Sequence, residues 1–166
     1  DIMQGLSVII SSACTYLYIQ TPYLLPTEPI LWALKTAALS GVDVRIMIPE
    51  RADASLVHCA TLSYLTELLE AGIKVYMYQK GFLHSKLWVC DDVFSSVGST
   101  NMDFRSFEHN FEINAFMYDE ASARLLKEIF LSDQKDAELL QNRSWSMRPW
   151  YQKVIESIIR LFAPLL

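Results

Sequence analysis

The strongest constraint on the fold is a pattern that occurs twice: a helix-like segment with an apolar stripe, a glycine, and a run of β-branched and aromatic residues. The first copy is the helix-like segment 28–40, followed by Gly41 and the run 42–49 (VDVRIMIP). The second copy is the helix-like segment 55–71, followed by Gly72 and the run 73–78 (IKVYMY). A glycine directly after a helix is the usual left-handed cap, and the runs that follow have the composition of buried strands. Helix alternating with strand predicts an α/β fold whose sheet is largely parallel in this part.

Residues 2–27 contain no charged side chain, which on length alone suggests a membrane span. Gln20, Pro22 and several serines and threonines weaken that interpretation. A helix over about residues 2–13 followed by a buried strand over 16–21 explains the segment better, so we expect both to belong to the globular core.

The pattern changes after residue 78. Residues 83–90 and 94–98 predict a hairpin, residues 110–118 (NFEINAFMY) a further strand, and the chain from Glu120 onward reads as helical. No linker rich in glycine or serine divides the chain. We therefore expect one domain over residues 1–166, with an α/β core to about residue 118 and a helical tail over 119–166.

Composition narrows the possible partners. The net charge of −5 argues against a broad nucleic-acid surface, which would need clustered lysine and arginine. Cys14, Cys59 and Cys90 are odd in number and include no C-x-x-C pair, which favours free thiols in a reducing compartment. No metal site and no cofactor is predicted.

Residues 82–103 (FLHSKLWVCDDVFSSVGSTNMD) carry the chemistry of the chain. The residues of the motif in this segment are His84, Lys86, Asp91, Gly98, Ser99 and Asn101. In extended chain, side chains two residues apart point to the same side. The side chains of His84 and Lys86 therefore lie on one side of their segment, and those of Ser99 and Asn101 can lie on one side of the returning segment. An imidazole, an ammonium, a hydroxyl and an amide in one small volume suit a phosphoryl group.

Two acidic residues fit this pocket less simply. Asp91 is five residues after Lys86, so on a regular strand its side chain would point to the opposite side. We therefore interpret it mainly as a turn residue whose carboxylate accepts from backbone N–H groups. Glu112 interrupts an apolar strand and needs a partner if it is buried. A histidine ring nitrogen is the favoured partner; the alternative is a glutamate on an edge strand facing water.

These residues resemble the phospholipase D superfamily, whose signature is the His-Lys-Asp motif. Residues 18–26 (YIQTPYLLP), 37–50, 67–86 and 101–120 are similar to the C-terminal half of bacterial cardiolipin synthases. The resemblance implies an αβα sandwich with a mixed sheet flanked by helices. Because the chain begins at Asp1 rather than Met, we expect it to be a fragment of a longer, membrane-associated protein of the bacterial inner membrane, itself soluble or peripheral.

The resemblance also implies an activity: two phosphatidylglycerol molecules condense into cardiolipin and release glycerol. His84 would form a phosphohistidine, with Lys86 and Asp91 completing the catalytic motif. Lys86 and Asn101 would hold phosphate oxygens, Ser99 would position the phosphate, and Glu112 would orient the His84 ring.

Proteins of this class use two such motifs, and this chain has one. The second would come from an upstream half of the same chain or from a homodimer mate. One alternative is a phosphodiesterase, a phospholipase D or nuclease, formed by homodimerisation of a single-motif chain. Another is a non-catalytic half that serves as a scaffold.

The last predicted helix, over residues 149–162, has an apolar face. It places Tyr151, Val154, Ile155, Ile158 and Phe162 together, with Trp145 and Trp150 nearby. Such a stripe either packs on the core or lies at a lipid surface, and both interpretations stay open at this point.

Overall fold

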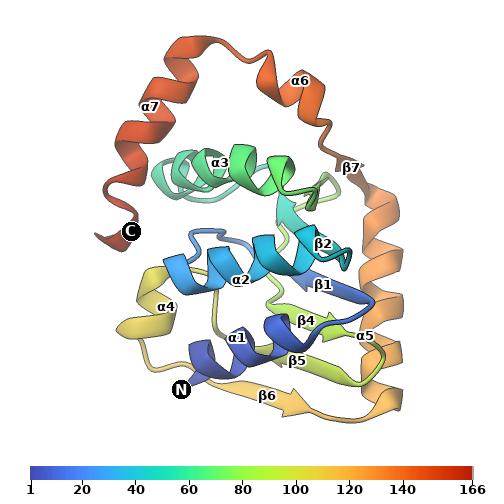
Figure 1. Cartoon of the computed structure of the whole chain (residues 1–166). Helices are drawn as coiled ribbons and strands as arrows, with labels where there is room; N and C mark the ends of the chain where they lie inside the picture. Colours follow the sequence, from blue (N-terminus) through green and yellow to red (C-terminus); the bar gives the residue numbers. More distant parts are fainter. Residues whose placement is uncertain (166) are drawn as a thin grey trace.

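The computed structural model describes residues 1–165 and contains a seven-stranded sheet in the order β6-β5-β4-β1-β2-β3-β7 (Figure 1). The strands are β1 (Tyr16–Gln20), β2 (Asp43–Pro49), β3 (Lys74–Tyr78), β4 (Leu87–Cys90), β5 (Phe94–Gly98), β6 (Asn114–Met117) and β7 (Ala137–Leu139). β1, β2 and β3 are parallel to one another, and the other neighbours are antiparallel. The predicted mixed sheet flanked by helices is confirmed.

The parallel half of the sheet comes from the repeated pattern in the sequence. Helix α2 (Glu28–Leu39) precedes β2, and helix α3 (Ser55–Glu70) precedes β3. Gly41 and Gly72 have φ values of 96° and 87°, so each is the left-handed cap that the spacing predicted. Helices α1 (Ile2–Ser12), α2 and α3 contribute to the larger hydrophobic core, which includes Leu6, Ile10, Ile30, Leu34, Leu65 and Leu68.

The charge-free N-terminal segment divides into α1 and β1, as the sequence predicted. All five residues of β1 are buried, because the strand lies at the centre of the sheet between β4 and β2. Over residues 1–165 no helix combines the length and the apolar character that crossing a bilayer requires.

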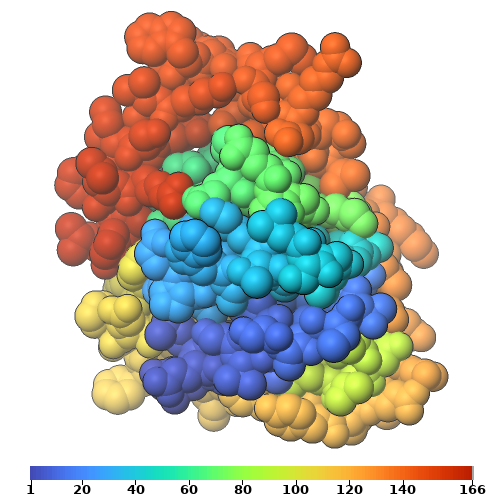
Figure 2. Space-filling model, in the orientation of Figure 1, coloured from blue at the N-terminus to red at the C-terminus, as the bar shows by residue number. Residues whose placement is uncertain are grey.

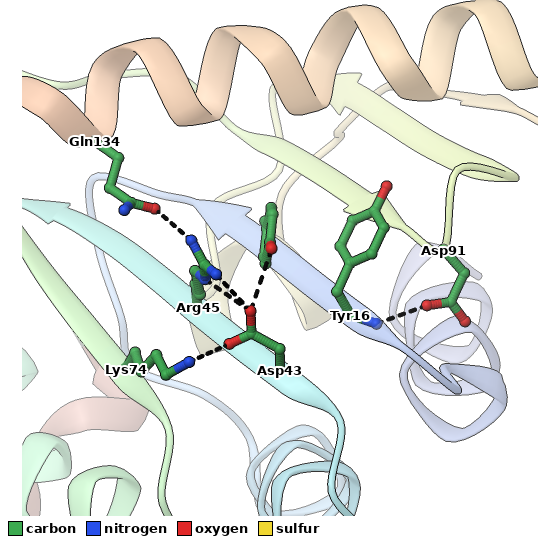
Figure 3. Close-up of polar contacts among 7 residues, drawn as sticks. Tyr16, Asp43, Arg45, Lys74, Asp91 and Gln134 are labelled. Carbon is green, nitrogen blue, oxygen red and sulfur yellow. Dashed lines mark hydrogen bonds and ion pairs between the residues drawn. The ribbon is translucent and has the colours of Figure 1, made fainter.

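Helix α5 (Glu120–Asp133) contributes to a second, smaller core, to which Ala123 and Phe130 belong. Phe130 stacks on Tyr18, with ring centroids 4.9 Å apart. A polar cluster continues this face toward β2 and β3 (Figure 3): the Asp43 carboxylate accepts from Arg45 at 2.6 Å and from Lys74 at 2.7 Å.

The hairpin is shorter than the sequence predicted. β4 begins at Leu87 rather than at residue 83, so the residues before it are extended chain outside the sheet. Asp91 and Asp92 turn the chain back with φ values of 51° and 55°, a left-handed conformation that aspartate tolerates better than most residues.

The tail is not purely helical, because β7 pairs antiparallel with β3 and forms an edge of the sheet. Helices α6 (Asn142–Ser146) and α7 (Trp150–Arg160) then pack against α3. Trp145 on α6 is buried, and its ring N–H donates to the Thr66 hydroxyl at 3.1 Å. The space-filling view shows this segment, orange to red, along the outside of the molecule beside α3 (Figure 2).

Candidate active site

The motif residues gather at the end of the sheet where β1 and β5 finish and β4 begins. His84 and Lys86 lie in the extended segment that enters β4, while Ser99 and Asn101 follow the last residue of β5. The Gly98 N–H donates to the Lys86 carbonyl at 3.3 Å, which aligns the two segments. A side chain at position 98 would overlap Asn114 and the carbonyl oxygen of Ile113, so only glycine fits there.

Lys86 is buried and its ammonium touches His84. The Lys86 Nζ donates to the His84 carbonyl oxygen at 2.8 Å and lies 3.1 Å from Nδ1 and 3.3 Å from Nε2 of the ring. Lys86 is 8% exposed, whereas His84 is exposed. The site therefore offers a histidine ring to solvent with a positive charge fixed behind it.

The environment of Lys86 lowers its pKa. Burial is the largest cause because it disfavours the charged ammonium, and the carboxylates of Glu112, Asp103 and Asp53 act in the opposite direction. These three acids partly offset the effect of burial on the Lys86 pKa.

Glu112 has a different partner from the one expected. The Ser99 hydroxyl donates to the Glu112 carboxylate, and the Asn110 side chain donates to it at 3.3 Å. Among the contacts of the described residues, the His84 ring nitrogens meet Lys86 and not Glu112. In this structure the His84 ring meets Lys86, and the orientation of the ring by Glu112 stays a prediction.

The physical reason for the contact between Glu112 and Ser99 lies in the position of β6, which begins at Asn114. Glu112 thus precedes the strand, and its segment is held against Ser99 by backbone bonds: the Ser99 N–H donates to the Ile113 carbonyl at 2.9 Å, and the Ile113 N–H donates to the Ser99 hydroxyl at 3.0 Å. This pairing brings the carboxylate of Glu112 to the hydroxyl beside it.

Asn101 lies at the same end of the sheet, where the N–H of the next residue, Met102, donates to the Thr21 hydroxyl at 3.2 Å. Its Oδ1 atom is buried and has no hydrogen-bond partner among the described residues. Buried polar atoms without a partner are rare in folded proteins. The unused atom is an acceptor, so it could bond a donor on a ligand, whereas a phosphate oxygen would need the Nδ2 group of the same side chain.

Asp91 lies at the opposite end of β4 from Lys86, since the whole strand separates them. Its carboxylate accepts from the backbone N–H groups of Cys14 at 2.7 Å, Thr15 at 2.9 Å and Tyr16 at 2.7 Å. Figure 3 shows the bond to Tyr16. These three bonds are what the supporting role requires, and they place the carboxylate away from His84 and Lys86.

Three further polar contacts near the site were not predicted from the sequence. The Ser85 hydroxyl donates to the side chain of Gln20 at 2.7 Å, and Gln20 in turn donates to Asp133 at 2.8 Å. The Tyr23 hydroxyl donates to the Asp53 carboxylate at 2.9 Å. The signal for the first contact was available, because Gln20 is a polar residue within a charge-free, buried strand.

A cavity of about 400 Å³ adjoins His84. Its lining includes Arg51, Lys80 and Phe82, and the Phe82 ring lies 5.2 Å from the His84 ring. Glu50 also lines the cavity, and Lys80 is paired with Asp136 at 3.2 Å, so Arg51 is the cation of this lining that has no ion pair among the described residues. His84 does not line the cavity itself and is next to it through the contact with Phe82.

Comparisons with known proteins show the family of the chain. The family described as "Cardiolipin synthase, PLD-like domain" matches residues 6–134. Cardiolipin synthase of Geobacillus sp. is 49% identical over 95% of this chain and 32% of its own length. Cardiolipin synthase 2 of Staphylococcus epidermidis is 48% identical over the whole chain and 34% of its own length. The chain thus spans about a third of these relatives.

Solved structures share the fold. Nuc of Salmonella typhimurium, described as a phospholipase D family member, superimposes with a TM-score of 0.70 at 25% identity, over 83% of this chain and 90% of its own. Phosphatidylserine synthase of Haemophilus influenzae gives a TM-score of 0.77 at 16% identity, over 99% of this chain and 45% of its own. The chain belongs to the phospholipase D superfamily, in the family of cardiolipin synthase PLD-like domains.

Proposed function

We propose that the chain supplies one of two His-Lys-Asp motifs of a phosphatidyltransferase, which condenses two phosphatidylglycerol molecules into cardiolipin and glycerol. The observation that carries the proposal is the contact between His84 and Lys86: an exposed imidazole backed by a buried ammonium. The similarity to cardiolipin synthases over 95–100% of the chain supports the choice of substrate.

In the first step a ring nitrogen of His84 attacks the phosphorus of one phosphatidylglycerol. The bond from phosphorus to the glycerol oxygen breaks, and the phosphatidyl group stays on the histidine. Lys86 lies close enough to stabilise the negative charge on the non-bridging oxygens as the attack proceeds. In the second step the hydroxyl of another phosphatidylglycerol attacks the phosphohistidine and gives its proton to the group that protonated the leaving glycerol. The bond from phosphorus to the His84 nitrogen breaks, and cardiolipin leaves.

Asn101 and Ser99 complete the phosphate pocket in this proposal. Asn101 binds a non-bridging oxygen by donating from its Nδ2 group, because its buried Oδ1 atom is an acceptor and cannot bond to a phosphate oxygen. Ser99 positions the phosphate, and Glu112 holds the Ser99 hydroxyl in place by accepting from it. Arg51, in the cavity beside His84, is placed to contact the head group.

The leaving glycerol oxygen needs a proton, and His84 cannot give one while its nitrogen attacks phosphorus. General acid help of this kind is worth about 10²–10⁴ in rate. We propose that a second His-Lys-Asp motif provides the acid, either from an upstream half or from a second copy of the chain. Through this longer assembly the protein would act at the bacterial inner membrane.

A second candidate is a phosphodiesterase, a phospholipase D or nuclease, assembled from two single-motif chains. One observation favours it: the match to Nuc covers 90% of that chain, so a protein of this length can carry the fold by itself. The net charge of −5 weighs against a nucleic-acid substrate.

The test is to incubate the purified protein, at a concentration at which sedimentation shows two copies to be assembled, with labelled phosphatidylglycerol in mixed micelles and to separate the lipid products. Cardiolipin indicates transfer to a lipid alcohol, and phosphatidic acid indicates hydrolysis. His84→Ala should abolish either product, whereas His109→Ala, a matched change of another exposed histidine, should retain full activity. Cleavage of single-stranded DNA without any lipid product would overturn the proposal in favour of a nuclease.

A further inference from the structure

Helix α7 packs against α3 with a mixed polar surface rather than with its apolar stripe. Glu156 is the buried residue of the helix, and its carboxylate accepts from Arg148 at 2.5 and 3.1 Å. The Arg148 guanidinium lies over the ring of Trp145, 3.2 Å from the centroid. An ion pair and a cation–π contact thus hold the inner side of α7 in place.

The same inner side continues one turn further along the helix. Arg160 donates to Glu67 at 3.1 Å and lies over the Tyr64 ring on α3. Ile159 and Ala163 complete the contact with the core. Glu156, Ile159, Arg160 and Ala163 follow the spacing of a single helix face, so the orientation of α7 is fixed by this face.

The apolar stripe therefore points outward, and the expectation that it packs on the core is wrong. Ile158 is 53% exposed, and Trp150 and Leu161 are 75% and 78% exposed. The outer apolar face is made of Trp150, Tyr151, Val154, Ile155, Ile158, Leu161 and Phe162. An apolar surface of this continuity on one helix marks an interaction site.

The charge of this segment differs from that of the rest of the chain. Residues 142–166 carry four cations and one acid, a net charge of +3, which leaves ten cations and eighteen acids, a net charge of −8, for residues 1–141. Arg148 and Arg160 are paired on the inner side with Glu156 and Glu67, so Arg143 and Lys153, both exposed and in no ion pair among the described residues, are the cations that the segment presents to solvent. An apolar outer face accompanied by these two cations is complementary to a surface that is negatively charged and apolar beneath.

The segment also lies close to the candidate active site. The 3-10 turn that follows α7, η2 (Ala163–Leu165), packs against α4 (Phe104–Glu108), and α4 begins three residues after Asn101. In Figure 1 the C-terminal end of α7 descends toward α4, on the side of the sheet where β6 begins. A surface that binds α7 would therefore be held near the mouth of the site.

We propose that the outer face of α7 docks the chain on an anionic lipid bilayer. The helix would lie in the plane of the interface, with Trp150 and Tyr151 at the level of the head groups and the aliphatic residues below them. A second copy of the chain is a less suitable partner for the outer face of α7 than a bilayer, because pairing two such faces would bring two positively charged segments together. The proposal is independent of the reaction assigned to His84.

The test is flotation of the purified protein with vesicles of phosphatidylglycerol and phosphatidylcholine, and with vesicles of phosphatidylcholine alone. Truncating the chain before α6 would uncover the core under Trp145, so point variants are used instead. Val154→Glu combined with Ile158→Glu places two charges on the outer face. The matched control, Leu125→Glu with Ile129→Glu, makes the same change at exposed positions with the same spacing on α5.

We expect the wild-type chain to bind the anionic vesicles more tightly than the neutral ones. The α7 variant should lose about tenfold or more in partitioning, and the α5 control should stay close to wild type. His84→Ala should bind as wild type does, which separates docking from catalysis. Circular dichroism melting should show that all variants are folded.

Two results would overturn the proposal. One is equal vesicle binding by the α7 variant and the α5 control. The other is a wild-type dimer, detected by sedimentation, that the α7 variant converts to monomer while neither protein binds vesicles; the outer face would then be a contact between copies of the chain.

Discussion

The ammonium of Lys86 lies 3.1 Å from Nδ1 of His84 and donates to the carbonyl oxygen of the same residue at 2.8 Å. The lysine therefore fixes both the backbone and the ring of the proposed nucleophile. Because Lys86 is buried, it can keep this position while the histidine remains open to substrate.

Lys86→Met should abolish lipid transfer, with a loss of about 10²-fold or more, since the phosphate charge would lose its fixed cation. The melting temperature of the Lys86→Met variant should not be lower than that of the wild type, although its activity is lost. Burial lowers the pKa of Lys86, so folding disfavours its charged form, and the methionine removes that cost. A variant that loses activity only because it unfolds, seen as a lowered melting temperature, would contradict this account.

The pH dependence of activity should follow the same lysine. The protonated form is the active one, and its pKa lies below the ordinary value of 10.5, so activity should fall on the alkaline side earlier than for an exposed lysine. Asp53→Asn removes a carboxylate that raises this pKa, and should move the alkaline limb to lower pH. A limb that stays in place, or moves upward, would show that another group titrates.

Asp91→Ala should destabilise the fold more than it slows chemistry. The change removes an acceptor of three backbone N–H groups and places alanine at a φ of 51°, at a combined cost of about 2–4 kcal/mol in the free energy of unfolding. Asp91→Asn keeps an acceptor oxygen and tolerates the turn, so it should cost less. Urea titration measures both, and equal stability of the two variants would disprove the supporting role.

Asp43 gives a stability test that does not involve the active site. Burial raises its pKa, but the hydrogen bonds from Arg45 and Lys74 outweigh that effect and the pKa is lowered. The stabilisation is therefore present above the unfolded value of 3.8 and is lost as the pH falls through the folded pKa. Asp43→Asn should cost about 1–3 kcal/mol at pH 7 and much less near pH 2.5, by urea titration. An equal cost at both values would exclude the charge as the cause.

The sequence predicted the parallel half of the fold because Gly41 and Gly72 mark the ends of regular helices. It did not predict β7, because three residues that include Glu138 carry too little alternation to indicate a strand. The success and the failure have the same cause, which is that sequence patterns are strong in long elements. They are weak in a short strand that forms only because it pairs with another part of the fold.

The same limit applies to side-chain partners. The spacing of His84 and Lys86 placed them together because extended chain has a simple period, and they touch. The partner of Glu112 was not predictable, since Ser99 is brought to it by pairing between separate segments. The orientation of α7 was hidden for a similar reason: the ion pair of Glu156 with Arg148 turns the polar side inward.

A verified monomer of the chain should not synthesise cardiolipin at an appreciable rate, because it lacks a group to protonate the leaving glycerol. The check is an assay with phosphatidylglycerol in detergent, with the mass in solution measured at the same protein concentration. Robust synthesis by a monomer would show that one motif suffices and that the second-motif proposal is wrong.

The most direct test of the central claim is to identify the residue that carries the phosphatidyl group. The protein is mixed with a phosphatidyl ester of an activated phenol, whose leaving group needs no general acid, quenched in alkali, in which phosphohistidine survives, and analysed by peptide mass spectrometry. The account predicts an acid-labile adduct on His84 that is absent from His84→Ala and retained in His109→Ala. An adduct on another residue, or one that persists in His84→Ala, would contradict the assignment of His84 as the nucleophile.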